Sequence, residues 1–331
     1  MSLGKGFVAM SAAADFIGTG AIEVPEFEAE ILDVVRRTSV ALNRFPSIPA
    51  TGHPHRYFEQ LDIARGGFMD PRNIVPVIAG PTRAERSAFI KAVVNQSNLS
   101  LFDKEVTEQQ GRFASVVAKD INDILTGIET TRAAAVWAGT DTSMLVPTTV
   151  QYMGLLRQIT LQAVIAPGAS IIDGLKSVIA SMVSNQTFVV KPTAIYLTAV
   201  LGDYIDREAK AAKIELKDVD VMAGVTVSSL STQAGRIPLI QDPWMPTEAS
   251  PTNTYGFGGA PAGNKNYFAV ILSEGEIEMP YISGASSNPM PRLFQLGLVG
   301  NLAGQYVGVK FDTLIAKGPS YMHAAVAVQR P

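Results

Sequence analysis

Six prolines between residues 46 and 81 constrain this chain more than any other feature of its sequence. They stand at positions 46, 49, 54, 71, 76 and 81, so no helix can run through the segment. Two runs between them, RYFEQLDIARGG and RNIVPVIAG, read as strands, with turn residues in between. We therefore predict a long two-stranded excursion from Pro46 to about Thr82. Because an isolated two-stranded ribbon is marginal in water, another surface must cover one of its faces.

Helical periodicity marks the chain on either side of this excursion. Residues 26–42 place apolar side chains on one helical face, and residues 109–136 carry the strongest helical signal in the chain. In the second segment Ile121, Ile124 and Ile128 recur at steps of three and four. A helix of that length extends about 40 Å, which is enough for it to form the backbone of a domain.

Helices and strands alternate after residue 166, which predicts a small α/β unit. Ser170 and Asp173 form a capping signal in front of an apolar helical run. The further elements expected here are strands at 187–190 and 194–197, a helix at 199–213, and strands at 225–230 and 236–240.

The rest of the chain is a loop followed by strands. Residues 247–266 are rich in Pro, Gly and Asn, and loops of that length are usually functional or lie at an interface. Five apolar runs then read as successive strands: YFAVIL, EIEMPYI, LFQLGLV, QYVGVKFDTLIA and MHAAVAVQR. The predicted fold class is α+β.

Composition restricts the kinds of partner. Hydrophobic residues make up 47% of the chain and charged residues only 17%, which favours a surface that is partly buried against other chains. The net charge is −3 with no basic stripe, which argues against sequence-specific nucleic-acid binding. The absence of cysteine excludes disulfides and thiolate chemistry. Asp15 interrupts the apolar run Phe7–Ala14, so we expect no signal peptide, and no apolar run is long enough to predict a transmembrane helix.

The histidines are candidates for chemistry, but each has an ordinary structural interpretation. His53 and His55 could offer two imidazoles to a metal with Glu59 or Asp62 nearby, but their spacing matches no established ligand pattern, and a polar loop tip is the ordinary interpretation. His323 has no visible triad context. The sequence therefore predicts no metal site.

Paired carboxylates and a glycine-rich run give equally weak signals. Asp120 and Asp123 share a solvated helix face, and Asp218 and Asp220 lie in a loop or on one side of a strand. The run GFGGAPAG has Pro261 where a dinucleotide-binding loop needs glycine, and no Walker sequence follows it. We expect no catalytic residue and no cofactor.

Charged residues in and after the excursion are candidates for contacts between subunits. Nucleic-acid binding favours basic residues without interleaved acids, whereas alternating charges set register between subunits. The candidates are Arg65, Arg72, Arg83, Arg86, Asp62 and Asp70.

The stretch GRIPLIQDPWMP places an acid beside one of the chain's two tryptophans. No base, nucleophile or metal partner for Asp242 stands near it in the sequence, and Asp242-Pro243 predicts a turn that ends a strand. Trp244 has enough area to anchor a core or an interface, so we count it among the candidate inter-subunit contacts.

The order of these elements resembles the major capsid proteins of tailed double-stranded-DNA bacteriophages. The run SIIDGLKSVIASMVSNQTFVVKPTAIYLTAV is similar to the helix and strand of the family's axial domain, and GRIPLIQDPWMP to its strand ending in a Met-Pro corner. The run YFAVILSEGEIEM is similar to the strands that return to the peripheral domain. The resemblance covers nearly the whole chain, although each motif is degenerate.

The resemblance implies a division of the chain into five parts. These are an N-terminal arm and helix at 1–47, an extended β-hairpin loop at 48–84, a peripheral domain at 85–165 with spine helix 107–136, an α/β axial domain at 166–246, and a long loop with a β-rich return to the peripheral domain at 247–331.

The resemblance also implies function and partners. The chain would assemble with itself into hexamers and pentamers of an icosahedral head shell, in the host bacterial cytoplasm, and remain in the virion. Portal, scaffolding and decoration proteins and non-specifically contacted DNA would be its partners, with no membrane.

Two departures from the family pattern matter, and two alternatives stay open. No lysine occurs between Lys5 and Lys91, so we expect no autocatalytic cross-link of the hairpin loop. Some members of the family begin with a long charged helical scaffolding segment that a protease removes. Here the arm helix is expected from residue 26, so we expect assembly to use a separate scaffold or none. An encapsulin-like compartment shell and, from another class, a small-molecule enzyme that uses the histidines or Asp218 and Asp220 are the alternatives.

Overall fold

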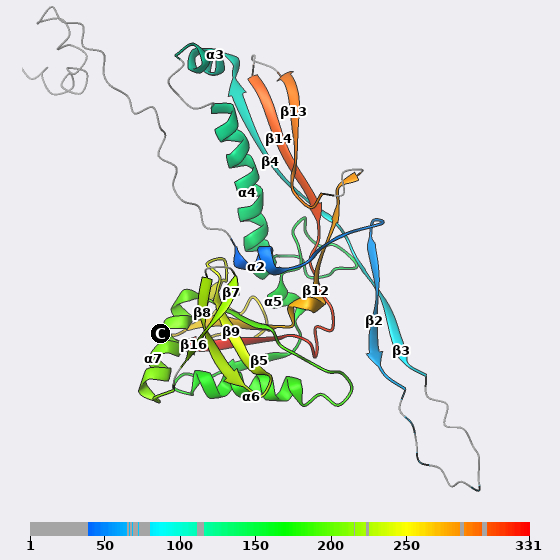
Figure 1. Ribbon diagram of the computed structural model, residues 1–331, viewed down its shortest axis with the longest axis vertical. Coiled ribbons are helices and arrows are strands. Elements are labelled where there is room, and N and C mark those ends of the chain that lie inside the picture. Colours follow the sequence, from blue (N-terminus) through cyan, green and yellow to red (C-terminus); the bar gives the residue numbers. More distant parts are fainter. Residues whose placement is uncertain are drawn as a thin grey trace, which may run out of the picture.

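The computed structural model describes residues 39–331 except 65, 67, 69–71, 73–79, 111–115, 215, 223–224, 285–287 and 300–302. It consists of an eight-stranded sheet, a six-stranded sheet and a separate two-stranded hairpin. In Figure 1 the eight-stranded sheet forms the lower body, the long strands β4, β13 and β14 rise above it beside α4, and the hairpin leaves on one side. The predicted α+β class is confirmed.

The eight-stranded sheet forms the larger core. Its strand order is β5-β16-β11-β6-β9-β8-β7, and β10 pairs with β11. The strands are β5 (Gln162–Ile165), β16 (Ala324–Arg330), β11 (Lys265–Leu272), β6 (Ala194–Leu197), β9 (Gly235–Gln241), β8 (Val225–Thr232), β7 (Lys217–Met222) and β10 (Thr247–Ala249).

Two layers bury this sheet on both faces. Helices α6 (Ile171–Val183) and α7 (Ala199–Ala211) pack on one face, and α2 (Val40–Arg44), α5 (Leu155–Gln158) and the end of α4 (Val116–Ala138) pack on the other. Strands β6, β11 and β16 are therefore buried almost throughout, which explains their continuous apolar sequences.

This sheet crosses the boundary that we expected at residue 246. Strands β11 and β16 belong to the segment 247–331, for which the resemblance implies a return to the peripheral domain, but β11 pairs with β6 and β16 pairs with β11 and β5 in the eight-stranded sheet. The physical reason is that an apolar strand needs cover on both faces, which only the middle of a covered sheet provides. Of the later strands, β12, β13, β14 and β15 lie in the six-stranded sheet instead.

The six-stranded sheet carries the long spine helix. Its order is β1 (Ser47–Pro49), β12 (Ile277–Ile282), β14 (Ala303–Asp312) and β13 (Arg292–Val299), with β15 (Ile315–Ala316) on β12 and β4 (Lys91–Ser100) on β14. Ile124 and Ile128 of α4 are buried against this sheet, as their spacing predicts. Gly308 permits the close approach, because a Cβ there would lie 2.6 Å from Ile124 Cγ2.

Two predicted helices have different bounds in the structure. The spine helix α4 covers Val116–Ala138, and a second helix, α3 (Leu101–Gln110), precedes it. The arm helix predicted over 26–42 lies outside the described residues up to position 38. Ser39 is extended, at φ −77° and ψ 124°, so α2 begins only at Val40 and ends at Arg44.

The predicted capped helix is confirmed, but the prediction of the two strands that follow it is wrong for the first of them. The Ser170 hydroxyl accepts a hydrogen bond from the Asp173 amide, which starts α6 as predicted. Residues 187–190 form no strand, because the Asn185 side chain accepts hydrogen bonds from the amides of Thr187 and Phe188 and holds a turn. The strand at 194–197 is confirmed as β6.

The predicted hairpin is confirmed, with its second strand placed later than expected. Strand β2 (His55–Asp62) pairs antiparallel with β3 (Thr82–Ala88), starting from His55 opposite Ala88. Most of the expected strand at 72–80 lies outside the described residues. Because β3 continues to Ala88, the hairpin extends past the expected limit at residue 84.

Candidate assembly surfaces

The hairpin has one face against the body and one face open to solvent. Tyr57 and Glu59 are buried, and Tyr57 packs with Ala88 and Ile315. Phe58 points the other way and is 74% exposed. The hairpin extends away from the body of the subunit. The exposed Phe58 ring on its open face is therefore an apolar contact that a partner would cover.

The charged candidates divide between described and undescribed positions. Arg83 and Asp62 are exposed on the hairpin, and Asp62 accepts a hydrogen bond from the Ile63 amide. Arg86 is half-exposed and pairs with Glu59 of the same chain at 3.2 Å. Arg72 is exposed, whereas Arg65 and Asp70 lie outside the described residues. Contact of these residues with a neighbouring subunit stays a prediction.

Sequence reasoning missed the residue that anchors the hairpin. Glu59 accepts a hydrogen bond of 2.7 Å from the backbone amide of Gly318, in addition to its pairing with Arg86. It is 8% exposed, although its sequence position resembles that of any other hairpin carboxylate. The alternation of buried and exposed side chains in β2 is the signal that could have indicated its inward direction.

A second apolar surface lies on the loop that follows α4. Leu145, Val146 and Val150 are 64%, 65% and 85% exposed. The loop is nevertheless fixed, because the buried Asp141 accepts hydrogen bonds from the Thr148 amide and hydroxyl at 2.9 and 2.8 Å. The hydrogen bonds of Asp141 therefore fix the loop in a conformation that leaves its apolar side chains exposed.

Lys91 closes the same loop from strand β4. Its Nζ lies 2.8 Å from Asp141 Oδ2 and 2.6 Å from the Thr149 carbonyl. Burial acts to raise the pKa of Asp141, but the hydrogen bonds from Lys91 and Thr148 outweigh it and lower the pKa to about 2. The carboxylate therefore stabilises the fold in its ionised form.

Replacing Asp141 by Asn is expected to weaken the fold at pH 7 by about 1.5–3 kcal/mol, because the bonds to a charged group are lost. The folded pKa lies below the unfolded one, so the wild-type contribution is present above about pH 4 and is lost as the pH falls towards about 2. Urea unfolding at several pH values measures both effects. The Asp141→Asn variant should lose less stability than the wild type across that acid range. Asp218→Asn, at an exposed position, is the matched control, and equal acid losses in wild type and Asp141→Asn would contradict the assignment.

The exposed face of the peripheral sheet is also apolar. Val94 of β4 and Phe294 of β13 are 55% and 44% exposed, and the register places both on the side away from α4. The Arg292 guanidinium lies 5.7 Å from the ring centroids of Phe294 and Phe311. This face is a third surface that a neighbouring chain can cover.

Asp242 forms a buried corner, as its sequence context predicted. It is 0% exposed and accepts hydrogen bonds from the Ser39 hydroxyl at 2.8 Å and the Trp244 amide at 2.9 Å. The carboxylate thus joins the arm to the turn that ends β9. Its partners are a hydroxyl and backbone groups, which is a structural arrangement.

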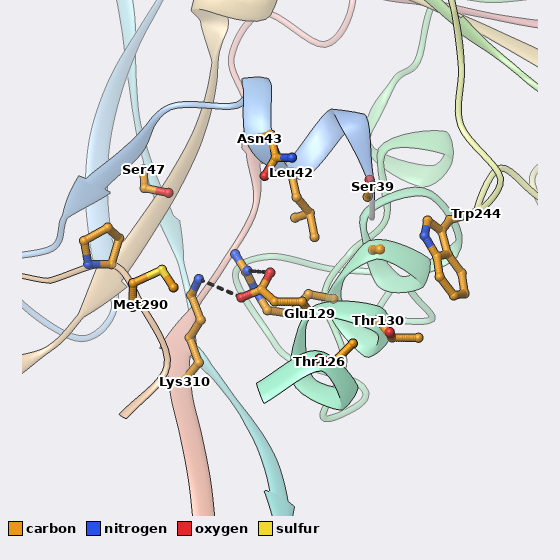
Figure 2. A pocket seen from close by; sticks show the side chains of 13 residues that line it. Ser39, Leu42, Asn43, Ser47, Thr126, Glu129, Thr130, Trp244, Met290 and Lys310 are labelled. Carbon is orange, nitrogen blue, oxygen red and sulfur yellow. Dashed lines mark hydrogen bonds and ion pairs between the residues drawn. The ribbon is translucent and has the colours of Figure 1, made fainter. Parts of the chain in front are cut away.

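Trp244 is partly buried against the core and lines a cavity of about 280 Å³. Figure 2 shows Trp244 and Lys310 on opposite sides of Glu129, with Leu42 above them. The indole Nε1 of Trp244 is buried without a hydrogen-bond partner. Trp244 therefore packs against the core of its own chain, and a role between subunits stays a proposal.

Glu129, Arg132 and Lys310 line this cavity and belong to one ionic network. Arg132 donates to Asp312 Oδ2 from Nε at 2.8 Å, and the Tyr152 hydroxyl donates to the other oxygen of Asp312. Lys310 Nζ lies 3.6 Å from Glu129 and 4.0 Å from Asp312. Burial and the nearby Arg132 charge lower the pKa of Lys310, and burial raises the pKa of Tyr152 well above its ordinary value. The network joins the spine helix to β14.

A second network attaches the arm to the axial sheet. Arg44 donates from Nε and Nη2 to the two oxygens of Glu274, each at 2.6 Å, and the Tyr196 hydroxyl donates to the same carboxylate. Burial acts to raise the pKa of Glu274, but these hydrogen bonds, with that from Thr193, lower it. Arm, β6 and the turn before β12 are therefore held together by one carboxylate.

The histidines considered as catalytic candidates have structural roles. His323 is fully buried, and burial lowers its pKa to about 4 against the raising effect of its hydrogen bond to the Lys317 carbonyl. Its Nδ1 accepts from the Ser273 amide at 3.4 Å. His53 Nδ1 accepts from the Ile90 amide, and His55 begins β2, where burial lowers its pKa.

The paired carboxylates lie far from these histidines along the chain and in other elements. Asp218 and Asp220 are exposed on β7, and Asp120 of α4 accepts a hydrogen bond from the Ser97 hydroxyl at 3.3 Å. The glycine-rich loop folds onto the core, where Phe257 packs against Phe268.

Among the described residues, no group of three or more His, Asp or Glu side chains can hold a metal ion. Within the same residues, none of the helices has both the length and the apolar character to cross a membrane.

Comparison with solved structures identifies the fold. The chain superposes on the encapsulin of the holo-SrpI complex from Synechococcus elongatus PCC 7942 with a TM-score of 0.62 and 12% identity, over 96% of this chain and 94% of that one. It matches a chain from Gordonia phage Cozz at a TM-score of 0.61 and 12% identity, over 94% and 92% of the two chains. It matches the capsid of a native GTA particle with a TM-score of 0.64 and 10% identity, over 95% of this chain and 97% of that one.

The chain therefore has the α+β fold of tailed-phage major capsid proteins, and the resemblance in the sequence is confirmed at the level of the fold. Encapsulin and the GTA capsid share this fold, so the fold defines a class of shell proteins. No family model and no curated protein matches the sequence.

Proposed function

We propose that this chain is the repeating subunit of an icosahedral shell, and specifically the major capsid protein of a tailed phage with double-stranded DNA. The hairpin is the observation that carries the proposal. It extends from the body, and the exposed large apolar side chains along it are Phe58, Leu61, Ile63 and Phe68, with Phe58 74% exposed among charged residues. A subunit that uses this surface on a neighbour removes from water an area that its own fold leaves exposed.

The other surfaces support the same proposal. The loop with Leu145, Val146 and Val150 and the open face of β4, β14 and β13 expose further apolar area at separate places on the chain. Separate patches allow each subunit to contact several neighbours, as hexamers and pentamers require. The sum of such contacts stabilises a shell even where each is modest.

Partners and location follow from the proposed role. The chain would assemble with itself in the host bacterial cytoplasm and remain in the virion, with portal, scaffolding and decoration proteins around it. Contact with packaged DNA would be non-specific, because a net charge of −3 gives a lining that does not trap a polyanion. The role is structural and needs no catalytic site or cofactor.

The likeness to an encapsulin over 96% of this chain supports a second candidate, a bacterial compartment shell. The contents of the particle separate the two. Particles isolated from the source organism are treated with nuclease, opened and analysed for DNA and for co-packaged protein. Nuclease-protected double-stranded DNA of uniform length supports the head shell. A packaged enzyme without DNA would replace it with the compartment shell.

A further inference from the structure

We infer that residues 317–322, here called the strap, couple the hairpin to the loop that follows α6. The strap contacts the hairpin twice. Its Gly318 amide donates to Glu59 Oε1 at 2.7 Å, and its Tyr321 hydroxyl donates to the Gln60 carbonyl at 3.2 Å. Both acceptors lie on β2, so a displacement of the strap changes the direction in which the hairpin leaves the body.

Hydrogen bonds within the strap link its residues, so that they would move together. Gly318 has a φ of 63°, and its carbonyl accepts hydrogen bonds from the amides of Tyr321 at 3.1 Å and Met322 at 2.8 Å. A Cβ at position 318 would lie 2.9 Å from Tyr321 Cζ. The left-handed backbone and this lack of space both favour glycine, and they hold the Tyr321 ring directly over the turn.

On its other side the strap contacts the axial unit. The ring of Tyr321 stacks on Phe188 with centroids 4.7 Å apart and an interplanar angle of 13°. Phe188 belongs to the turn that the Asn185 side chain holds after α6. Tyr321 thus presents its ring to one unit of the fold and its hydroxyl to another.

The stacked pair has room to change position. Phe188 borders a surface cavity of about 430 Å³ that is also lined by Val183, Val189 and Gln233. Close-packed interiors resist displacement, whereas a ring beside an open cavity can shift without displacing other core side chains. A shift of Phe188 would carry Tyr321 and, through it, β2. The α6–β6 loop would therefore set the inclination of the hairpin.

Hydrogen exchange of the full-length, unassembled chain tests this inference. Phe188→Ala removes the stacking, and Tyr321→Phe removes only the hydroxyl contact with the hairpin. We expect each change to make amide exchange in 55–62 and 82–88 about fivefold faster, the effect of one lost hydrogen bond of ordinary strength. The double variant should give no more than the larger single effect, because both changes interrupt one path.

Val189→Ala is the matched control, because Val189 lies in the same loop and is 79% exposed. It should leave exchange in the hairpin unchanged, and all variants should leave β11 unchanged. Faster exchange confined to 184–193 in Phe188→Ala would overturn the inference, as would additive effects or an equal acceleration in β11. Because the test uses the single chain, its failure leaves the shell proposal intact.

Discussion

Replacing Phe58 by Asp is expected to abolish shell assembly and to leave the free energy of unfolding of the single chain within about 0.5 kcal/mol of the wild-type value. Phe58 is 74% exposed on the open face of β2, so the subunit itself loses little packing. In a shell each copy would have to bury the new carboxylate against a neighbour, with Glu85 directly opposite it on β3. That cost falls on every subunit contact of this kind.

Particle yield by electron microscopy and urea unfolding of the single chain measure the two halves of this prediction. Phe58→Leu, which keeps an apolar side chain at the same place, is the matched control and should still form shells. Wild-type yields of particles from Phe58→Asp would show that the open hairpin face makes no contact between subunits. A large loss of unfolding free energy would instead place Phe58 in the subunit core.

The second large effect concerns stability. Asp312→Ala is expected to lower the free energy of unfolding by about 3–5 kcal/mol, because it leaves the Arg132 guanidinium buried without its main partner. Arg132 is 3% exposed, and it contacts Asp312 Oδ2 from Nε at 2.8 Å and from Nη2 at 2.7 Å. The Tyr152 hydroxyl loses its acceptor in the same change.

The matched control for this prediction is an ion pair on the surface. Asp203 and Arg207 of α7 are 2.6 Å apart, but their side chains are 55% and 71% exposed. Asp203→Ala should cost at most about 0.5 kcal/mol, since exposed helix pairs contribute little. Urea unfolding of both variants at neutral pH gives the comparison. Equal losses for Asp312→Ala and Asp203→Ala would contradict the role assigned to the buried network.

The elements with a strong local pattern could be predicted from the sequence. Ile124 and Ile128 lie where the 3.6-residue period places them, and Ser170 caps α6 as its spacing with Asp173 predicts. Prolines between 46 and 81 predicted the hairpin, although they did not locate β3. Local propensity is sufficient where one segment determines its own conformation.

The contacts that join the units could not be predicted in this way. Glu59 and Gly318 are 259 positions apart, Ser39 and Asp242 are 203 apart, and Arg132 and Asp312 are 180 apart. No periodicity links such partners, because each pair depends on the complete topology. The turn at Asn185 was missed for a different reason, since its side chain competes with a strand that the apolar sequence favours.

Negative-stain electron microscopy of the purified chain tests whether it assembles with itself. The chain is imaged over a range of concentrations and salt conditions, with and without a co-expressed scaffold. We expect hexamers, pentamers or closed shells. A strictly monomeric chain under every one of these conditions would contradict this expectation.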